Sequence, residues 1–212
     1  MITTKALIGA ATFGLATLVS SSAIAQSVVE TDSAGLIGKQ YVGVDLFLED
    51  FRDLPDNGYG AALSYNKPVS EMLDLSAALS MAQVDSRTID LSSNALEGGA
   101  VYYSRLEGFT PFIFGGLGYE WREIDLPGNL PDDKDEGFFY RVGFGFEIPL
   151  ADKTAAVLKL SYSDGVDSGA EDSIGGEVGI NHWCTSNFAV NGSILVVEDD
   201  SVSFRIGARF AF

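Results

Sequence analysis

Histidine and cysteine are the side chains with which this sequence could perform nucleophilic catalysis, and it contains one of each. Both lie in the stretch NHWCTSN, as His182 and Cys184. A catalytic histidine needs a serine, a thiol or an acid held beside it. The sequence contains neither an H-x-S nor a G-x-S-x-G motif. We therefore expect no enzyme, and we interpret His182 as an interfacial residue and Cys184 as an inert thiol.

Clustered carboxylates form a second group with possible chemistry, because they are suitable ligands for a hard cation. They occur in the stretches LPDDKDEG, DSGAEDS and VEDDS. None of these stretches has the D-x-[DN]-x-[DN]-G spacing of a calcium loop. Solvated acidic loops are therefore favoured over a dedicated metal site, and no cofactor is predicted. The weak candidates for a metal site are Asp132, Asp133, Asp135, Asp199 and Asp200.

Charged residues also occur inside apolar stretches such as GYEWRE and FRIGARF. A charge in apolar surroundings is costly unless it is paired. We therefore predict a salt-bridged network inside the protein that acts as a structural plug, and a narrow or gated conducting path is the alternative. The predicted members of this network are Glu120, Arg122, Arg141, Glu147, Lys159, Glu177, Arg205 and Arg209.

Alternation of apolar and polar residues with a period of two defines the elements that must position these charges. In FFYRVGFGFEI, the bulky apolar residues share one parity, whereas Arg141 and Glu147 share the other with glycines. Successive side chains of a strand point to opposite faces, so such a segment is predicted to be a strand. The polar parity is rich in Gly, Ala and Ser and also includes Asp45, Asp74 and Glu97. We expect strands at residues 41–50, 58–66, 72–83, 94–103, 110–122, 138–148, 154–163, 173–183, 187–197 and 201–212.

The connections between these segments fall into two classes that alternate along the chain. NKPVS, SRLEGFT, PLADK and CTSN are short, whereas the other connections are generally longer and rich in Asp and Glu. Two kinds of rim are typical of an up-and-down barrel in a membrane. We predict an all-β, closed antiparallel barrel of ten transmembrane strands at residues 38–212, with eight strands as the alternative. A soluble sandwich is less favoured, because small residues dominate the polar face.

The N-terminus has the features of an export signal. Residues 1–25 contain a lysine, an apolar run and an A-x-A pattern that ends at Ala25, so we predict a signal peptide that is cleaved near this residue. Residues 26–37 are expected to form a short periplasmic segment. The formal net charge of −17 excludes nucleic acid as an expected partner, since binding to nucleic acid depends on clustered Lys and Arg.

The sequence resembles the small outer-membrane β-barrels of Gram-negative bacteria, in the class of outer-membrane protein A-like and opacity-like barrels. The signal, the stretches TPFIFGGLGYEW and YRVGFGFEI, and the tail that ends in Phe212 carry this resemblance over the whole mature chain. It implies location in the outer membrane, with eight strands more common than ten in that class. It also implies that the assembly machinery of the outer membrane reads the last strand. The assembly signal would comprise Phe204, Ile206, Phe210 and Phe212.

Aromatic residues near the strand ends are expected to form two girdles at the headgroup layers. The predicted girdle residues are Tyr59, Tyr65, Tyr119, Trp121, Tyr140, Tyr162 and Phe188. The expected partners are membrane lipid, lipopolysaccharide, the assembly machinery and divalent cations at the loops. The favoured function is structural or a surface interaction through the acidic loops. A small-solute channel is the alternative, and a lipid-modifying enzyme is a distant third.

Overall fold

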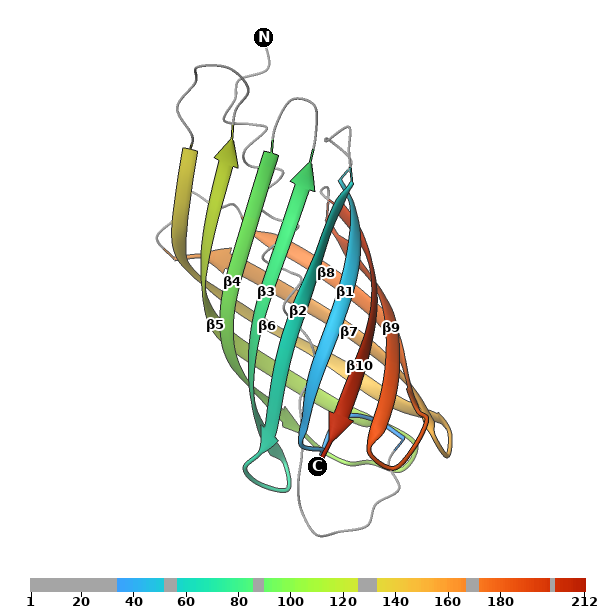
Figure 1. The fold of residues 1–212 in the computed structure, drawn as a ribbon. Coiled ribbons are helices and arrows are strands. Elements are labelled where there is room, and N and C mark those ends of the chain that lie inside the picture. Colours follow the sequence, from blue (N-terminus) through green and yellow to red (C-terminus); the bar gives the residue numbers. More distant parts are fainter. Residues whose placement is uncertain (1–33, 52–56, 86–89, 126–132, 167–171, 199–200) are drawn as a thin grey trace.

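The computed structural model describes residues 34–51, 57–85, 90–125, 133–166, 172–198 and 201–212. Within these residues the chain forms ten β-strands, and each strand pairs antiparallel with its neighbours in a closed sheet (Figure 1). The predicted ten-stranded barrel is therefore confirmed, and the alternative of eight strands is wrong. The strands are β1 (Tyr41–Phe51), β2 (Gly58–Pro68), β3 (Leu73–Asp85), β4 (Asp90–Tyr103), β5 (Thr110–Asp125), β6 (Asp133–Ala151), β7 (Thr154–Gly165), β8 (Ser173–Trp183), β9 (Phe188–Val197) and β10 (Ser201–Ala211).

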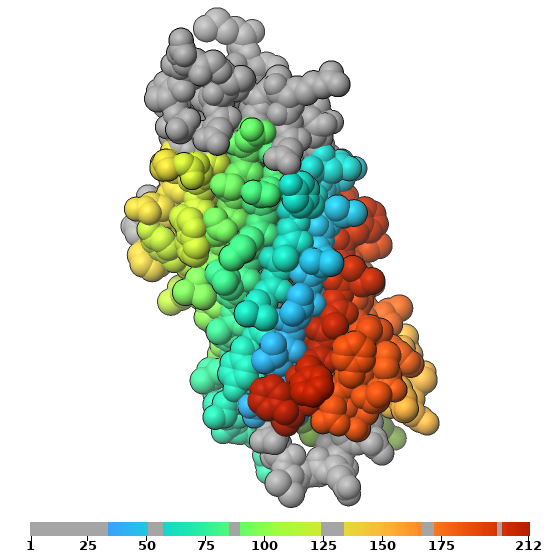
Figure 2. All heavy atoms as spheres, viewed as in Figure 1, coloured from blue at the N-terminus to red at the C-terminus, as the bar shows by residue number. Residues whose placement is uncertain are grey.

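The first and last strands close the barrel. β1 pairs with β10 from Tyr41 opposite Ala211 to Phe51 opposite Ser201. In Figure 2 the strands β2, β1, β10 and β9 form one continuous wall. The backbone N–H of Phe212 donates to the carbonyl of Gln40 at 3.3 Å, just before β1 begins. The aromatic tail is therefore part of the sheet that joins the two ends of the chain.

The barrel has two ends that differ in their connections. At the short-turn end, residues 69–72, 104–109, 152–153 and 184–187 link consecutive strands. At the long-loop end, the other connections contain all the internal gaps in the described residues. β5 and β6 have 16 and 19 residues, and at the long-loop end β6 extends beyond β7, because its pairing with β7 begins only at Phe139. No helix long and apolar enough to cross a membrane occurs in the part of the chain that the structure describes.

Alternation of burial along the strands follows the predicted parities. In β1, Tyr41, Asp45 and Phe47 are buried, whereas Val44 and Leu46 are exposed. The same alternation continues around the barrel, and large apolar residues such as Leu117 and Ile206 are exposed on the outer face. Since the strands turn their polar parity inward, the sheet gathers charges from several strands in the lumen.

The predicted signal peptide, residues 1–25, lies outside the described residues, as do residues 26–33 of the predicted periplasmic segment. The described part of that segment begins at Ala34, and Ala34, Leu36 and Ile37 are buried. These residues pack inside the short-turn end of the barrel, where Ile37 belongs to a cluster with Tyr103 and Phe112. A chain segment from outside the sheet therefore contributes to the interior.

Candidate functional site: the charged lumen

The most deeply buried ion pair of the lumen joins β10 to β1. One guanidinium nitrogen of Arg209, Nη2, donates to both carboxylate oxygens of Asp45 at 2.9 Å, and both side chains are almost fully buried. Asn191 on β9 adds a third hydrogen bond to Asp45, at 3.2 Å. Gly43 lies opposite Arg209 and Gly207 lies opposite Asp45, and a Cβ at either glycine would overlap the facing charged side chain. The two glycines therefore make room for the pair.

A second ion pair reaches across a strand. Arg141 on β6 donates to Glu97 on β4 at 2.7 Å, although β5 lies between these two strands. The intervening residue is Gly116, which is paired with Arg141 in the sheet. A Cβ on Gly116 would lie 2.8 Å from Glu97 Oε1. The absence of a side chain at this position therefore leaves room for the pair to cross β5.

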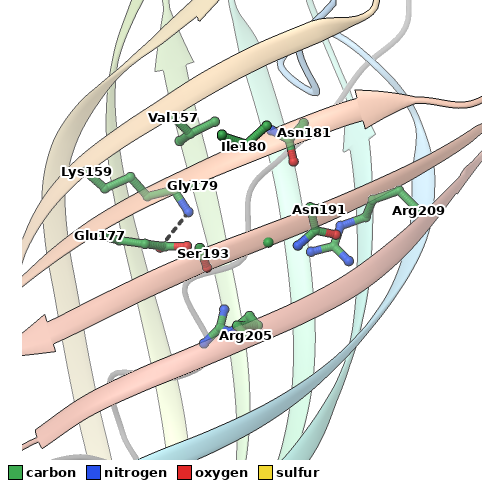
Figure 3. A pocket seen from close by; sticks show the side chains of 11 residues that line it. Val157, Lys159, Glu177, Gly179, Ile180, Asn181, Asn191, Ser193, Arg205 and Arg209 are labelled. Atoms are coloured by element: carbon green, nitrogen blue, oxygen red, sulfur yellow. Dashed lines mark hydrogen bonds and ion pairs between the residues drawn. The ribbon is translucent and has the colours of Figure 1, made fainter.

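The third pair borders a cavity in the lumen. Lys159 on β7 and Glu177 on β8 lie opposite each other in the sheet, and their charged atoms are 2.9 Å apart. The cavity has an empty volume of about 320 Å³, which includes space open to solvent. Figure 3 shows Arg205 and Arg209 from β10 on the other side of this cavity. The guanidinium of Arg205 lies 6.0 Å from the ring centre of Phe47.

A fourth group of charges lies nearer the long-loop end. Arg122 on β5 contacts Glu120 at 2.5 Å and Asp135 on β6 at 3.4 Å. Ser93 on β4 donates a hydrogen bond to Glu120 at 2.7 Å. Charges and a hydroxyl from β4, β5 and β6 therefore contact one another at this level of the barrel.

Glu147 differs from the other predicted members of the network because its carboxylate accepts hydrogen bonds from the backbone. The amide of Leu36 donates to Glu147 Oε2 at 2.8 Å, and the amide of Ile37 donates to the same oxygen at 3.4 Å. The predicted members are thus inward-facing but belong to separate groups. Arg209 is paired with Asp45 and Arg141 with Glu97. The predicted network did not include these two carboxylates.

Inward phenylalanine rings fill the remaining space beside glycines of the neighbouring strand. Phe112 and Phe114 on β5 lie opposite Gly145 and Gly143 on β6, and a Cβ at either glycine would overlap the facing ring. The same relation holds between Phe47 and Gly60 and between Phe139 and Gly118. A ring that covers a cross-strand glycine packs without a clash. In the sequence, Phe112 and Phe114 share one parity, and so do Gly143 and Gly145. This pattern is the signal from which the packing of rings on glycines could be predicted.

The predicted girdle and tail residues lie on the outer wall. Tyr119 packs edge-on against Phe138 with ring centres 4.9 Å apart, and Tyr140 lies 6.1 Å from Tyr162. Tyr59, Tyr65, Trp121 and Phe188 are exposed, as are Phe204, Ile206, Phe210 and Phe212 of the predicted assembly signal. The outer wall is therefore apolar along the middle of the strands and aromatic near their ends.

The remaining candidates for chemistry do not converge on one place. His182 is exposed at the short-turn end, with Nδ1 3.0 Å from the hydroxyl of Thr154, and Cys184 is an exposed free thiol. Among the described residues, no group of three or more His, Cys, Asp or Glu side chains could hold a metal ion. Asp135 contacts Arg122. The backbone of Asp133 is described without its side chain, and Asp132, Asp199 and Asp200 lie outside the described residues.

The fold is shared with bacterial outer-membrane barrels of known structure. The translocator domain of the autotransporter NalP from Neisseria meningitidis has a TM-score of 0.54 at 10% identity, over 82% of this chain and 88% of that chain. Ail, the attachment invasion locus protein of Yersinia pestis, has a TM-score of 0.43 at 12% identity, over 82% and 99% of the two chains. The KdgM porin has a TM-score of 0.45 at 15% identity, over 80% and 99%. At 10% identity, the match to the NalP domain shows a likeness of fold alone.

Comparison with curated protein sequences finds no significant match. The sequence model of the family described as "Outer membrane protein beta-barrel domain" matches residues 11–165, which is well over half of the chain. The closed sheet, its apolar outer wall and its charged lumen agree with this match. The chain therefore belongs to the outer-membrane β-barrel domain family and is a barrel protein of the Gram-negative outer membrane.

Proposed function

We propose that this barrel has a structural or surface-interaction role, with a closed lumen and with its acidic loops at the cell surface. Buried ion pairs in the middle of the lumen carry the proposal of closure. Each pair draws charged side chains from two strands into the space that a solute would occupy. The pairs are Arg209 with Asp45, Arg141 with Glu97, and Lys159 with Glu177.

Electrical recording tests the closed lumen. Refolded protein is added to a planar lipid bilayer, and we expect no stable single-channel steps. The migration of unheated and boiled protein on a gel shows that the same sample contains folded barrel. Reproducible unitary conductance from that sample would contradict the proposal.

A small-solute channel is the second candidate. The cavity beside Lys159, Arg205 and Arg209 supports it, because three cationic side chains could line a path for small anions. Swelling of liposomes that contain the protein distinguishes the two functions. Swelling in a small sugar would favour the channel, and no swelling with any solute would favour the closed barrel.

Acidic side chains at the long-loop end support a role at the surface. Asp50, Glu136, Asp172 and Glu198 are exposed there. We propose that this end faces outward and meets lipopolysaccharide and its divalent cations. Protease added to intact cells should cut within the long connections and spare the short turns. Calorimetry should show no saturable calcium site, since the acidic stretches lack the spacing of a calcium loop.

The last strand carries a proposal about assembly. We propose that the assembly machinery recognises β10, whose Phe204, Ile206 and Phe210 face outward and whose end lies beside Phe212. Phe212→Ser should then lower the amount of barrel inserted in cells without preventing refolding in detergent.

We also propose that the protein is not an enzyme, and His182→Ala should leave any lipid-modifying activity of the purified protein unchanged.

A further inference from the structure

Residues 34–40 cross the mouth of the barrel at its short-turn end, and we call them the strap. The side chain of Leu36 packs against Tyr41 of β1, Trp183 of β8 and Ala189 of β9. A segment that ran along the rim would contact only adjacent strands near its own position.

The next residue of the strap packs on a different part of the wall. Ile37 belongs to a cluster with Val101 and Tyr103 of β4, Phe112 of β5 and Val157 of β7. Leu36 and Ile37 are 1% and 6% exposed. Two consecutive side chains thus reach strands on both sides of the barrel, so the strap spans the lumen.

Two buried polar side chains bind the backbone of the strap. Glu147 accepts the amides of Leu36 and Ile37, and the indole N–H of Trp183 donates to the carbonyl of Gly35 at 3.3 Å. Glu147 and Trp183 come from β6 and β8 and are 4% exposed each. Both barrel side chains therefore bind a peptide backbone, one as the acceptor and the other as the donor.

The sequence of the strap fits this site at its glycines. A Cβ on Gly35 would overlap the carboxylate of Glu147. Gly38 has a φ of +94°, a conformation that favours glycine, and it turns the chain out of the mouth. Lys39 then lies 4.0 Å above the ring of Trp183, and Asn66 of β2 donates to its carbonyl at 3.2 Å. Recognition thus depends on close backbone approach as well as on apolar contact.

We propose that the short-turn mouth of the barrel is a peptide-binding site whose built-in ligand is the strap, and that the bound strap closes this end of the lumen. The ligand class is a short apolar peptide with glycine where the backbone meets Glu147. This inference deepens the closed lumen proposed above, because it assigns the seal at one end to a segment outside the ten strands. The closed order of the ten strands does not include the strap.

Fluorescence of Trp183 reports directly on the strap. The chain contains two tryptophans, and Trp121 is exposed on the outer wall, so Trp121→Phe leaves Trp183 as the single tryptophan, which is excited selectively over tyrosine. In this background, two full-length variants displace the strap without altering a strand. Gly35→Val overlaps Glu147, and Leu36→Asp places a charge against Tyr41 and Trp183. Gly98→Val is the matched control, because a Cβ there meets nothing within 4 Å.

Quenching by acrylamide should increase several-fold in Gly35→Val and Leu36→Asp and stay unchanged in Gly98→Val. An acetylated peptide with the sequence of residues 34–40 should then restore protection of Trp183 in a saturable manner. A tethered segment has an effective concentration of about millimolar, so the free peptide should act at about that concentration. A peptide that carries Val in place of Gly35 should not protect.

Three results would overturn the inference. Trp183 could stay equally protected in both strap variants, the wild-type peptide could give no protection at millimolar concentration, or the Val peptide could protect equally well. Conductance of the wild-type barrel would instead contradict the closed-lumen function, and it is measured without reference to Trp183. The two failures are therefore distinguishable.

Discussion

Carboxylates in the middle of the lumen and at its short-turn end are buried to a similar degree but are satisfied in different ways. Asp45 meets the guanidinium of Arg209, which the neighbouring strand provides. Glu147 meets the backbone amides of Leu36 and Ile37, which a segment outside the sheet provides. Asp45 is therefore paired within the sheet, whereas Glu147 finds its hydrogen-bond donors in the strap.

The largest effect is expected when a carboxylate in the middle of the lumen loses its charge. Asp45→Asn leaves the cation of Arg209 buried without its counter-charge, because Arg209 is 2% exposed. Removal of one partner of a buried ion pair costs about 3 to 5 kcal/mol. Urea unfolding of the barrel in lipid vesicles, followed by gel migration, should show a loss of this size.

The double variant Asp45→Asn, Arg209→Gln is the control for this prediction. It should be more stable than Asp45→Asn alone, since no buried charge is left unpaired. If the single and double variants unfold at the same urea concentration, the pair is not coupled in the way that its geometry indicates.

The same change at the short-turn end should have a smaller effect. Glu147→Gln removes the charge but keeps a carbonyl oxygen that can accept the amides of Leu36 and Ile37. Hydrogen bonds to a charged acceptor contribute about 1 to 2 kcal/mol more than neutral ones, so we expect a loss of about that size. A loss as large as that of Asp45→Asn would show that Glu147 is balanced mainly by a charge and not by the strap.

The sequence predicts the middle of the lumen better than its short-turn end, for a physical reason. A period of two fixes the face on which a side chain lies, so Asp45, Glu97 and Arg209 could be placed in the lumen from the sequence. Parity does not fix the register between strands, and the partners of Arg141 and Arg209 depend on register. The glycines at 43, 116 and 207 mark where charged side chains pass, but this is evident only once the strands are aligned.

The strap is harder to predict because its apolar and polar residues do not alternate with a regular period. AGLIGKQ contains two apolar residues between glycines, and such a stretch reads equally well as a linker. Its position follows from contacts with residues such as Tyr103, Glu147 and Trp183, which lie far away in the sequence. The apolar pair before β1 is the one local signal, since a linker in water has no need of it.

The smallest effect is expected at the long-loop end, where a carboxylate and its partner are both exposed. Glu123 and Lys134 form an ion pair on β5 and β6, with side chains 45% and 67% exposed. Exposed pairs contribute about 0 to 1 kcal/mol and are weakened by salt. Glu123→Gln should therefore change the urea midpoint slightly in dilute buffer and not at all in concentrated salt. The expected loss of stability therefore decreases in the order Asp45, Glu147, Glu123. This order reflects how deeply each carboxylate is buried and which kind of partner it has, because each substitution is nearly isosteric. If Glu123→Gln destabilised the barrel as much as Glu147→Gln did at high salt, removal of a carboxylate charge would itself lower the stability of this fold. The distinction between the middle of the lumen and its mouth would then lose its physical basis.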